Sequence, residues 1–165
     1  MRKLIVAVAF GVIFVGCHQP IKIEQNYPNG VLKSEGIVVN GQKQGPSKVF
    51  YPSGNLKEEG NWLKGKQIGQ WKFYYESGQM SSYINFKDDL QEGPSIFYYE
   101  NGQVAEKSYW LSGKINGLSE TFYPDGKKKK VAHWKNGQED GTIQNYDSDG
   151  KLINQGNWKA GKLLK

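Results

Sequence analysis

Short runs of alternating aromatic and polar residues recur along the chain, separated by polar stretches that contain glycine. One run covers residues 70–75 (QWKFYY), the stretch ESG follows it, and a second extended run covers residues 80–87. Aromatic residues favour strands, and glycine adopts the positive φ that tight turns need. Turns placed about every 8 to 12 residues predict an antiparallel meander, and no segment after residue 16 shows helical periodicity.

The pattern repeats with a period of 24 residues, so that FYYESG at residues 73–78 returns as FYYENG at residues 97–102. The glycines fall into columns with this period, of which the longest comprises Gly30, Gly54, Gly78, Gly102, Gly126 and Gly150. A tryptophan column comprises Trp62, Trp110, Trp134 and Trp158, with Val38 and Phe86 in its two other slots. Such periodicity indicates an internal structural repeat.

The fold class we predict is all-β, an array of 24-residue β-hairpin units in one elongated, twisted antiparallel sheet. About six units cover residues 26–165 and supply roughly eleven strands. Neighbouring residues of a strand point to opposite faces, so Tyr74 and Tyr75 predict an aromatic ladder on each face.

The first 16 residues, MRKLIVAVAFGVIFVG, differ from the rest of the chain. Arg2 and Lys3 precede an apolar run that is shorter than the roughly 20 residues of a membrane span, a pattern typical of an export signal. Cys17, the only cysteine, follows directly. This segment resembles the lipobox of bacterial lipoproteins, which implies cleavage before Cys17, acylation of Cys17, a tether over residues 17–25 and a location in the cell envelope.

Charge adds less than the repeat does. Removal of residues 1–16 takes away two of the 22 basic residues and lowers the formal net charge of +6 by two. The remaining excess suits an envelope protein near anionic lipid or glycan and does not call for nucleic acid. A lone cysteine also excludes an intramolecular disulfide, so burial and strand pairing must stabilise the fold.

The unit GNWLKGKQIGQWKFYYESG, residues 60–78, resembles the bacterial variant of the MORN repeat. The shared features are a glycine, an aromatic residue, a Gly-Lys turn, an aromatic pair and a further glycine, and they run from about Asn26 to the C-terminus. Asp89, Lys128 and Asp147 depart from their columns. The resemblance implies a β-hairpin repeat fold and a binding role, and an antitoxin role is described for some members of that family.

Candidate chemistry is sparse, which predicts that the chain is not an enzyme and uses no metal or cofactor. His133 occupies a slot that holds asparagine or tyrosine elsewhere, so we expect it to face solvent, and two histidines without cysteine make no metal set. Ser47, Ser95 and Ser119 share a column without an accompanying histidine. The acidic pairs, of which Glu139-Asp140 is one, lie mostly in turns, and none is embedded in apolar surroundings that would shift a pKa.

These observations favour a membrane-anchored module that binds a protein partner, with a toxin as one form of that partner. The alternatives are a module that binds cell-wall glycan or anionic lipid, and an enzyme that acts on glycan through turn carboxylates. The one basic run is more typical of a solvated hairpin arm than of a nucleic-acid site. The candidate binding surface comprises Trp62, Trp110, Trp134, Trp158, Tyr74, Tyr98, Lys127, Lys128, Lys129 and Lys130.

Overall fold

A computed structural model describes residues 19–165 and shows fifteen β-strands and no helix in that range. The strands are β1 (Ile21–Asn26), β2 (Leu32–Val39), β3 (Gln42–Lys43), β4 (Gly45–Phe50), β5 (Leu56–Leu63), β6 (Lys66–Tyr74), β7 (Met80–Lys87), β8 (Leu90–Tyr98), β9 (Val104–Leu111), β10 (Lys114–Ile115), β11 (Gly117–Phe122), β12 (Lys128–Lys135), β13 (Gln138–Tyr146), β14 (Leu152–Lys159) and β15 (Lys162–Leu163).

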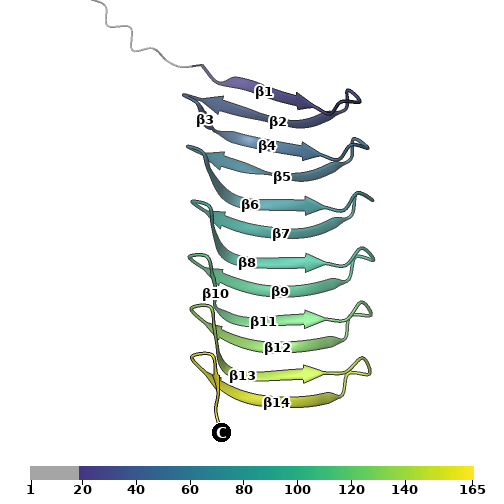
Figure 1. The fold of residues 1–165 in the computed structure, drawn as a ribbon, viewed down its shortest axis with the longest axis vertical. Coiled ribbons are helices and arrows are strands. Elements are labelled where there is room, and N and C mark those ends of the chain that lie inside the picture. The colour runs from purple at the N-terminus through teal and green to yellow at the C-terminus, as the bar shows by residue number, and fades with distance from the viewer. Residues whose placement is uncertain (1–18) are drawn as a thin grey trace, which may run out of the picture.

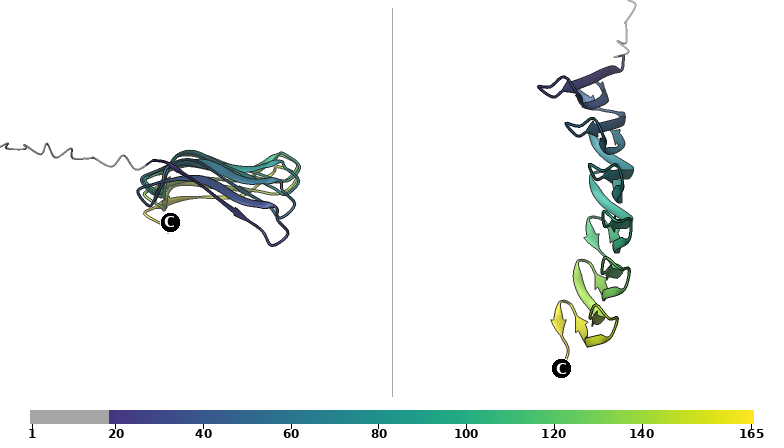
Figure 2. Two further views of the ribbon diagram at one scale, coloured as in Figure 1. Left: turned by 90° about the horizontal axis from the view of Figure 1, so that it is seen from above. Right: turned by 90° about the vertical axis from the view of Figure 1, so that its right-hand side faces the viewer.

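The strands form one open sheet in which each strand pairs antiparallel with its neighbours in sequence, except that β3 and β10 are short pieces beside β2 and β9 (Figure 1). Seen from the side, the sheet is a single layer that twists along its length (Figure 2). The predicted all-β repeat fold is therefore confirmed. We number the hairpins from one to six as units: β1–β2, β4–β5, β6–β7, β8–β9, β11–β12 and β13–β14.

Two details of the prediction are wrong. The sheet has fifteen strands instead of about eleven, because β3, β10 and β15 are two-residue strands that the repeat pattern does not mark and β1 precedes the first predicted unit. The sheet also begins before Asn26: β1 pairs with β2 from Ile21↔Val38 onward, so most of β1 lies in the segment predicted as a tether. Its side chains are polar or exposed because an edge strand has one neighbour only.

Each unit contains a turn within its hairpin, which we call the tyrosine turn, and is joined to the next unit by a linking turn. In the first tyrosine turn the Gly30 N–H donates to the Tyr27 carbonyl over 2.9 Å, and Gly30 has a φ of +84°. The first linking turn has positive φ at both Asn40 and Gly41, as a type I′ turn requires. These are the turns that the glycine columns and the Asn-Gly pair predict.

A narrow column of mostly small residues runs across the strands and forms the core of the sheet. Cross-strand partners in it include Ser95↔Ser108 and Ser119↔Ala132. Among the described residues, those that are buried are Gly60, Trp71, Ala132, Ile143, Ser82, Ser95, Ser108 and Ser119. A single-layer sheet buries few side chains completely, so stability has to come from contacts that repeat from unit to unit.

Candidate binding face

The tryptophan column lies over the column of small residues, and serine hydroxyls anchor its indole rings. The Trp110 Nε1–H is shared between the Ser95 and Ser108 hydroxyls, each 3.0 Å away. In the next unit the Trp134 Nε1–H donates to the Ser119 hydroxyl over 2.8 Å. Two of the three serines that share a column in the sequence, Ser95 and Ser119, therefore hold tryptophans in place.

The third unit solves the same packing problem differently. Trp71 stands in the slot that Ser95 and Ser119 occupy in later units, and it packs edge-on against Trp62 with ring centroids 5.2 Å apart. Its ring lies over Gly60, which leaves no room for a side chain there. The Nε1 atoms of Trp62 and Trp71 are buried without a hydrogen-bond partner. Aromatic packing replaces hydrogen bonding at this point of the column.

A second set of aromatic residues forms hydrogen bonds that connect consecutive units. Each of five tyrosines donates its hydroxyl hydrogen to a backbone carbonyl of the following unit, over 2.6 to 2.9 Å. We call this set the tyrosine ladder, and its donor and acceptor residues are Tyr27 to Phe50, Tyr51 to Tyr74, Tyr75 to Tyr98, Tyr99 to Phe122, and Tyr123 to Tyr146.

The ladder corrects the prediction of one aromatic ladder on each face of the sheet. Tyr75 follows the last residue of β6, Tyr74, and belongs to the tyrosine turn. The residues thought to alternate across a strand therefore differ in role. Tyr74 and Tyr98, which we predicted as binding residues, are half-buried, and their carbonyl groups accept ladder bonds.

The four lysines of the basic run have partners within the sheet. Lys127 Nζ lies 3.3 Å from Asp125 Oδ2, Lys128 Nζ lies 2.9 Å from Glu120 Oε1, and Lys130 Nζ lies 3.1 Å from Glu139 Oε1. The fourth, Lys129, places its ammonium 5.7 Å from the ring centre of Tyr123. The run is thus a partly neutralised hairpin arm, in line with the solvated arm that the sequence favours.

Tyr74 forms a side-chain hydrogen bond with a charged residue of the preceding unit. Its hydroxyl donates to Glu59 Oε1 over 2.9 Å. Partial burial, together with that carboxylate, raises the pKa of Tyr74 above its ordinary value. Because the pKa of Tyr74 is raised in the folded protein, neutral Tyr74 stabilises the fold. This contribution to the free energy of unfolding is complete below the ordinary tyrosine pKa of about 10 and is lost as the pH rises through the folded-state pKa.

We therefore expect Glu59→Gln to lower the pKa of Tyr74, since it removes the negative charge that disfavours the phenolate. Alkaline NMR titration of tyrosine labelled at the ring carbon next to oxygen would measure this, with Tyr74→Phe assigning the resonance. An unchanged titration curve in the glutamine variant would contradict the assigned role of Glu59.

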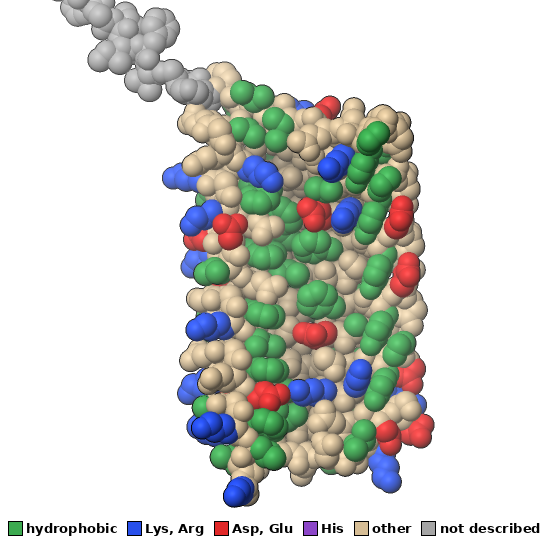
Figure 3. Space-filling view, viewed as in Figure 1, with side chains coloured by type: hydrophobic (Ala, Val, Ile, Leu, Met, Phe, Trp, Pro, Cys, Tyr) green, Lys and Arg blue, Asp and Glu red, His purple; other side chains and the backbone are tan. Residues whose placement is uncertain are grey.

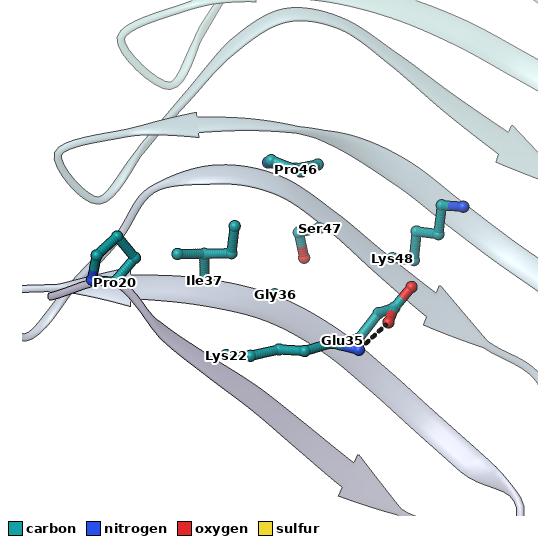
Figure 4. A pocket seen from close by; sticks show the side chains of 8 residues that line it. All are labelled: Pro20, Lys22, Glu35, Gly36, Ile37, Pro46, Ser47 and Lys48. Carbon is teal, nitrogen blue, oxygen red and sulfur yellow. Dashed lines mark ion pairs between the residues drawn. The ribbon is translucent and has the colours of Figure 1, made fainter.

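One hollow lies at the N-terminal end of the sheet and encloses about 440 Å³. It is bordered by Pro20 and Pro46, and Lys22 reaches across it to Glu35 with 3.2 Å between Nζ and Oε2 (Figure 4). The ion pair occupies the polar part of the hollow, and the one hydroxyl there, that of Ser47, has no histidine beside it. The arrangement offers no nucleophile and base pair.

The rest of the described chain is equally plain chemically. His133 is exposed, as predicted, with Nδ1 3.1 Å from the Thr142 carbonyl oxygen. Residues 19–165 contain no group of three or more His, Cys, Asp or Glu side chains that could hold a metal ion. Within the same range, no helix is long and apolar enough to cross a membrane.

The sheet has a broad face on which hydrophobic side chains recur (Figure 3). On the face drawn in Figure 3, hydrophobic side chains form columns that run down the length of the molecule, and many charged side chains lie along the two margins. The tryptophan column is half-buried, so part of each ring is exposed to solvent; its residues are Trp62, Trp110, Trp134 and Trp158. An extended face of repeated aromatic groups can contact a large partner but encloses no reacting atom.

Comparison with known proteins agrees with this geometry. The family model described as "MORN repeat variant" matches residues 43–64, 67–88, 91–111, 115–136 and 139–160. No curated protein matches the chain. Among solved structures, a mutant of S. aureus TarM in complex with fondaparinux, alpha-GlcNAc-glycerol and UDP is similar at 13% identity and a TM-score of 0.39, over 72% of this chain and 21% of that one.

The chain thus spans about a fifth of the length of that structure, 21%. The five family matches, in contrast, follow one another through most of the sheet, and each begins near a linking turn and ends near the next. Their spacing equals the period of the tyrosine ladder and of the tryptophan column. The protein is a member of the MORN repeat variant family.

Proposed function

We propose that the chain is a non-catalytic, lipid-anchored module of the cell envelope that binds another protein through its repeat sheet. The observation that supports binding most directly is the tryptophan column, in which half-buried tryptophans recur at the repeat period, while residues 19–165 contain no group of side chains that could hold a metal ion. Large interfaces between proteins are built on aromatic residues, whereas catalysis needs a pocket with convergent titratable groups.

A role as an antitoxin or immunity-type protein is one form of this proposal. A sheet that is held at the membrane and offers a long rigid face could neutralise a toxin by covering it. The alternative, a module for cell-wall glycan or anionic lipid, gains no support from the basic run, because Lys127, Lys128 and Lys130 are already engaged with carboxylates.

Affinity capture tests the proposal. The full-length chain with a C-terminal tag is expressed in a bacterial host, extracted in mild detergent, and the proteins that remain bound after a salt wash are identified by mass spectrometry. One dominant polypeptide, especially one that is toxic when expressed alone, supports the proposal. Retention of wall glycan or lipid without any protein refutes it in favour of the alternative.

The anchor has a separate test, and Cys17 lies outside the residues that the structure describes. We expect the wild-type chain to incorporate an alkyne-labelled fatty acid and to sediment with membranes, because acyl chains partition into the bilayer. Cys17→Ala should lose the label and move to the soluble fraction, while Ser53→Ala, in an exposed turn, should change neither. A Cys17→Ala chain that still carries the label would overturn this assignment.

A further inference from the structure

In three units, a lysine of the same chain places its ammonium group over the ring of the ladder tyrosine. The lysine six residues after the ladder tyrosine places its ammonium 5.7 Å from the ring centre in Lys33 over Tyr27, 5.5 Å in Lys57 over Tyr51, and 5.7 Å in Lys129 over Tyr123. These distances fall within the roughly 6 Å over which a ring face attracts a cation. The same ring position is therefore a cation site in each of these units.

Units three and four break this pattern. Ser81 and Ala105 stand where the lysines stand elsewhere, and neither Tyr75 nor Tyr99 has a lysine over its ring within residues 19–165. The short side chains leave a hollow, which we call the central tyrosine hollow. It is a shallow depression, open to solvent, with a volume of about 550 Å³, and its lining includes Phe73, Tyr75, Ser81, Phe97, Tyr99 and Ala105.

A second substitution also makes the charge of these two units more negative. The residue after the ladder tyrosine is Pro28, Pro52 and Pro124 in the units that have the lysine, but it is Glu76 and Glu100 in units three and four. Both glutamates are exposed, and neither forms an ion pair with another described residue. Two adjacent units therefore lose a cation at the ring and gain an anion beside it, in a chain of formal net charge +6.

We propose that the central tyrosine hollow binds a basic, extended segment of a partner protein, with one Lys or Arg side chain on the ring of Tyr75 and another on the ring of Tyr99. The inference rests on the proposed protein-binding function and names the chemistry of the partner. Glu76 and Glu100, the exposed residues that follow Tyr75 and Tyr99 in the chain, supply the counter-charges. The same glutamates disfavour anionic lipid or nucleic acid at this place, because like charges repel.

The repeat also fixes the spacing of the two basic residues. Tyr75 and Tyr99 occupy equivalent positions one unit apart, and a unit advances the sheet by two strands, roughly 9–10 Å. A polyproline II chain rises about 3.1 Å per residue and has three residues per turn, so side chains three residues apart lie on one face and match this distance. The expected segment therefore has the form basic-x-x-basic.

A fluorescein-labelled peptide with two arginines three residues apart among proline and glycine tests this with the full-length chain in neutral detergent. Fluorescence anisotropy should show saturable binding, and a peptide with glutamate in place of both arginines should not bind. Ser81→Lys with Ala105→Lys restores the lysine of the other units and should weaken binding about tenfold or more, since the rings are then covered from within.

The matched control adds the same two charges to the opposite side of the strands. Asn61 and Tyr109 are exposed and share a column there, so N61K with Y109K should change the affinity by less than about threefold through general repulsion. Replacing Glu76 and Glu100 with glutamine, which leaves the packing intact, should weaken binding several-fold and more so at low salt. Equal losses in both lysine pairs, or undiminished binding in S81K/A105K, would refute the site.

The outcomes also separate this inference from the function on which it rests. If affinity capture yields a protein partner and S81K/A105K captures it equally well, the hollow is not the site but the binding function stands. If no protein is captured while the peptide binds as expected, the site exists and the proposed function falls.

Discussion

Gly60→Ala should lower the free energy of unfolding by about 3 kcal/mol, the upper range for overpacking a well-filled core. A Cβ atom at Gly60 would lie 2.2 Å from Cδ2 and 2.3 Å from Cε2 of Trp71. Trp71 is only 2% exposed and is held by Trp62, Phe73 and Phe86, so its ring has little room to retreat. Urea unfolding followed by tryptophan fluorescence would measure the loss.

Gly36→Ala provides the matched control, because Gly36 holds the same place one unit earlier. A Cβ atom there would meet the Ser47 hydroxyl oxygen at 3.5 Å, which is ordinary contact, and alanine is favoured over glycine inside a strand by roughly 0.5–1 kcal/mol. We expect a neutral or slightly stabilising change. In a Trp71→Ser background, Gly60→Ala should lower the free energy of unfolding much less. An equal decrease in both backgrounds would contradict the role assigned to the indole.

The repeat could be predicted from the sequence because local backbone needs determine its signals. Gly30 and its equivalents adopt positive φ in the tyrosine turns, and Asn40 with Gly41 forms a linking turn, so these positions tolerate few residue types. Even the exception is local, since Asp89 takes the glycine slot with a φ of +69°. Such constraints act within a few residues and show directly as columns in the sequence.

Contacts between units were harder to predict, because they depend on where a side chain points beyond the end of its strand. The tyrosine ladder left one usable signal: its column contains only tyrosine from Tyr27 to Tyr123, whereas the preceding column accepts phenylalanine, as at Phe50 and Phe122. A strict need for the hydroxyl explains the difference. The strand β1 left no such signal, because edge residues pack against one neighbour and are free to be polar.

The candidate binding residues illustrate the same limit. The tryptophan column was found because aromatic residues recur at the period, but the partners of the basic run were not, since Glu120 and Glu139 lie on different strands from Lys128 and Lys130. The central tyrosine hollow was not predicted, because its signal in the sequence is the absence of lysine at residues 81 and 105, where Ser81 and Ala105 stand.

Removing the hydroxyls of the tyrosine ladder should destabilise the sheet in steps. Each Tyr→Phe change deletes one hydrogen bond between units, at a cost of about 1 kcal/mol, and leaves the ring in place. The five positions are separated by whole units, so the costs should add to about 5 kcal/mol when all are changed. That sum is comparable to the total stability of an ordinary domain, and it comes from the contacts that join one unit to the next. The five variants are Y27F, Y51F, Y75F, Y99F and Y123F.

Urea unfolding measured as the changes accumulate would show the steps, and Tyr109→Phe, at an exposed position, should change the free energy of unfolding by no more than about 0.5 kcal/mol. A five-fold variant within about 1 kcal/mol of wild type would contradict the ladder as a source of stability.

In the sixth unit an aspartate replaces the ladder tyrosine and stabilises its own turn. Asp147 holds the ladder position there, and its Oδ1 instead accepts hydrogen bonds from the backbone N–H groups of Lys151, over 2.9 Å, and Asp149, over 3.0 Å. Asp147→Tyr would remove both turn bonds, so it should cost about 1 kcal/mol although it restores the column consensus. A stabilising Asp147→Tyr would mean that the ring, and not the hydrogen bond to the next unit, is what the column preserves.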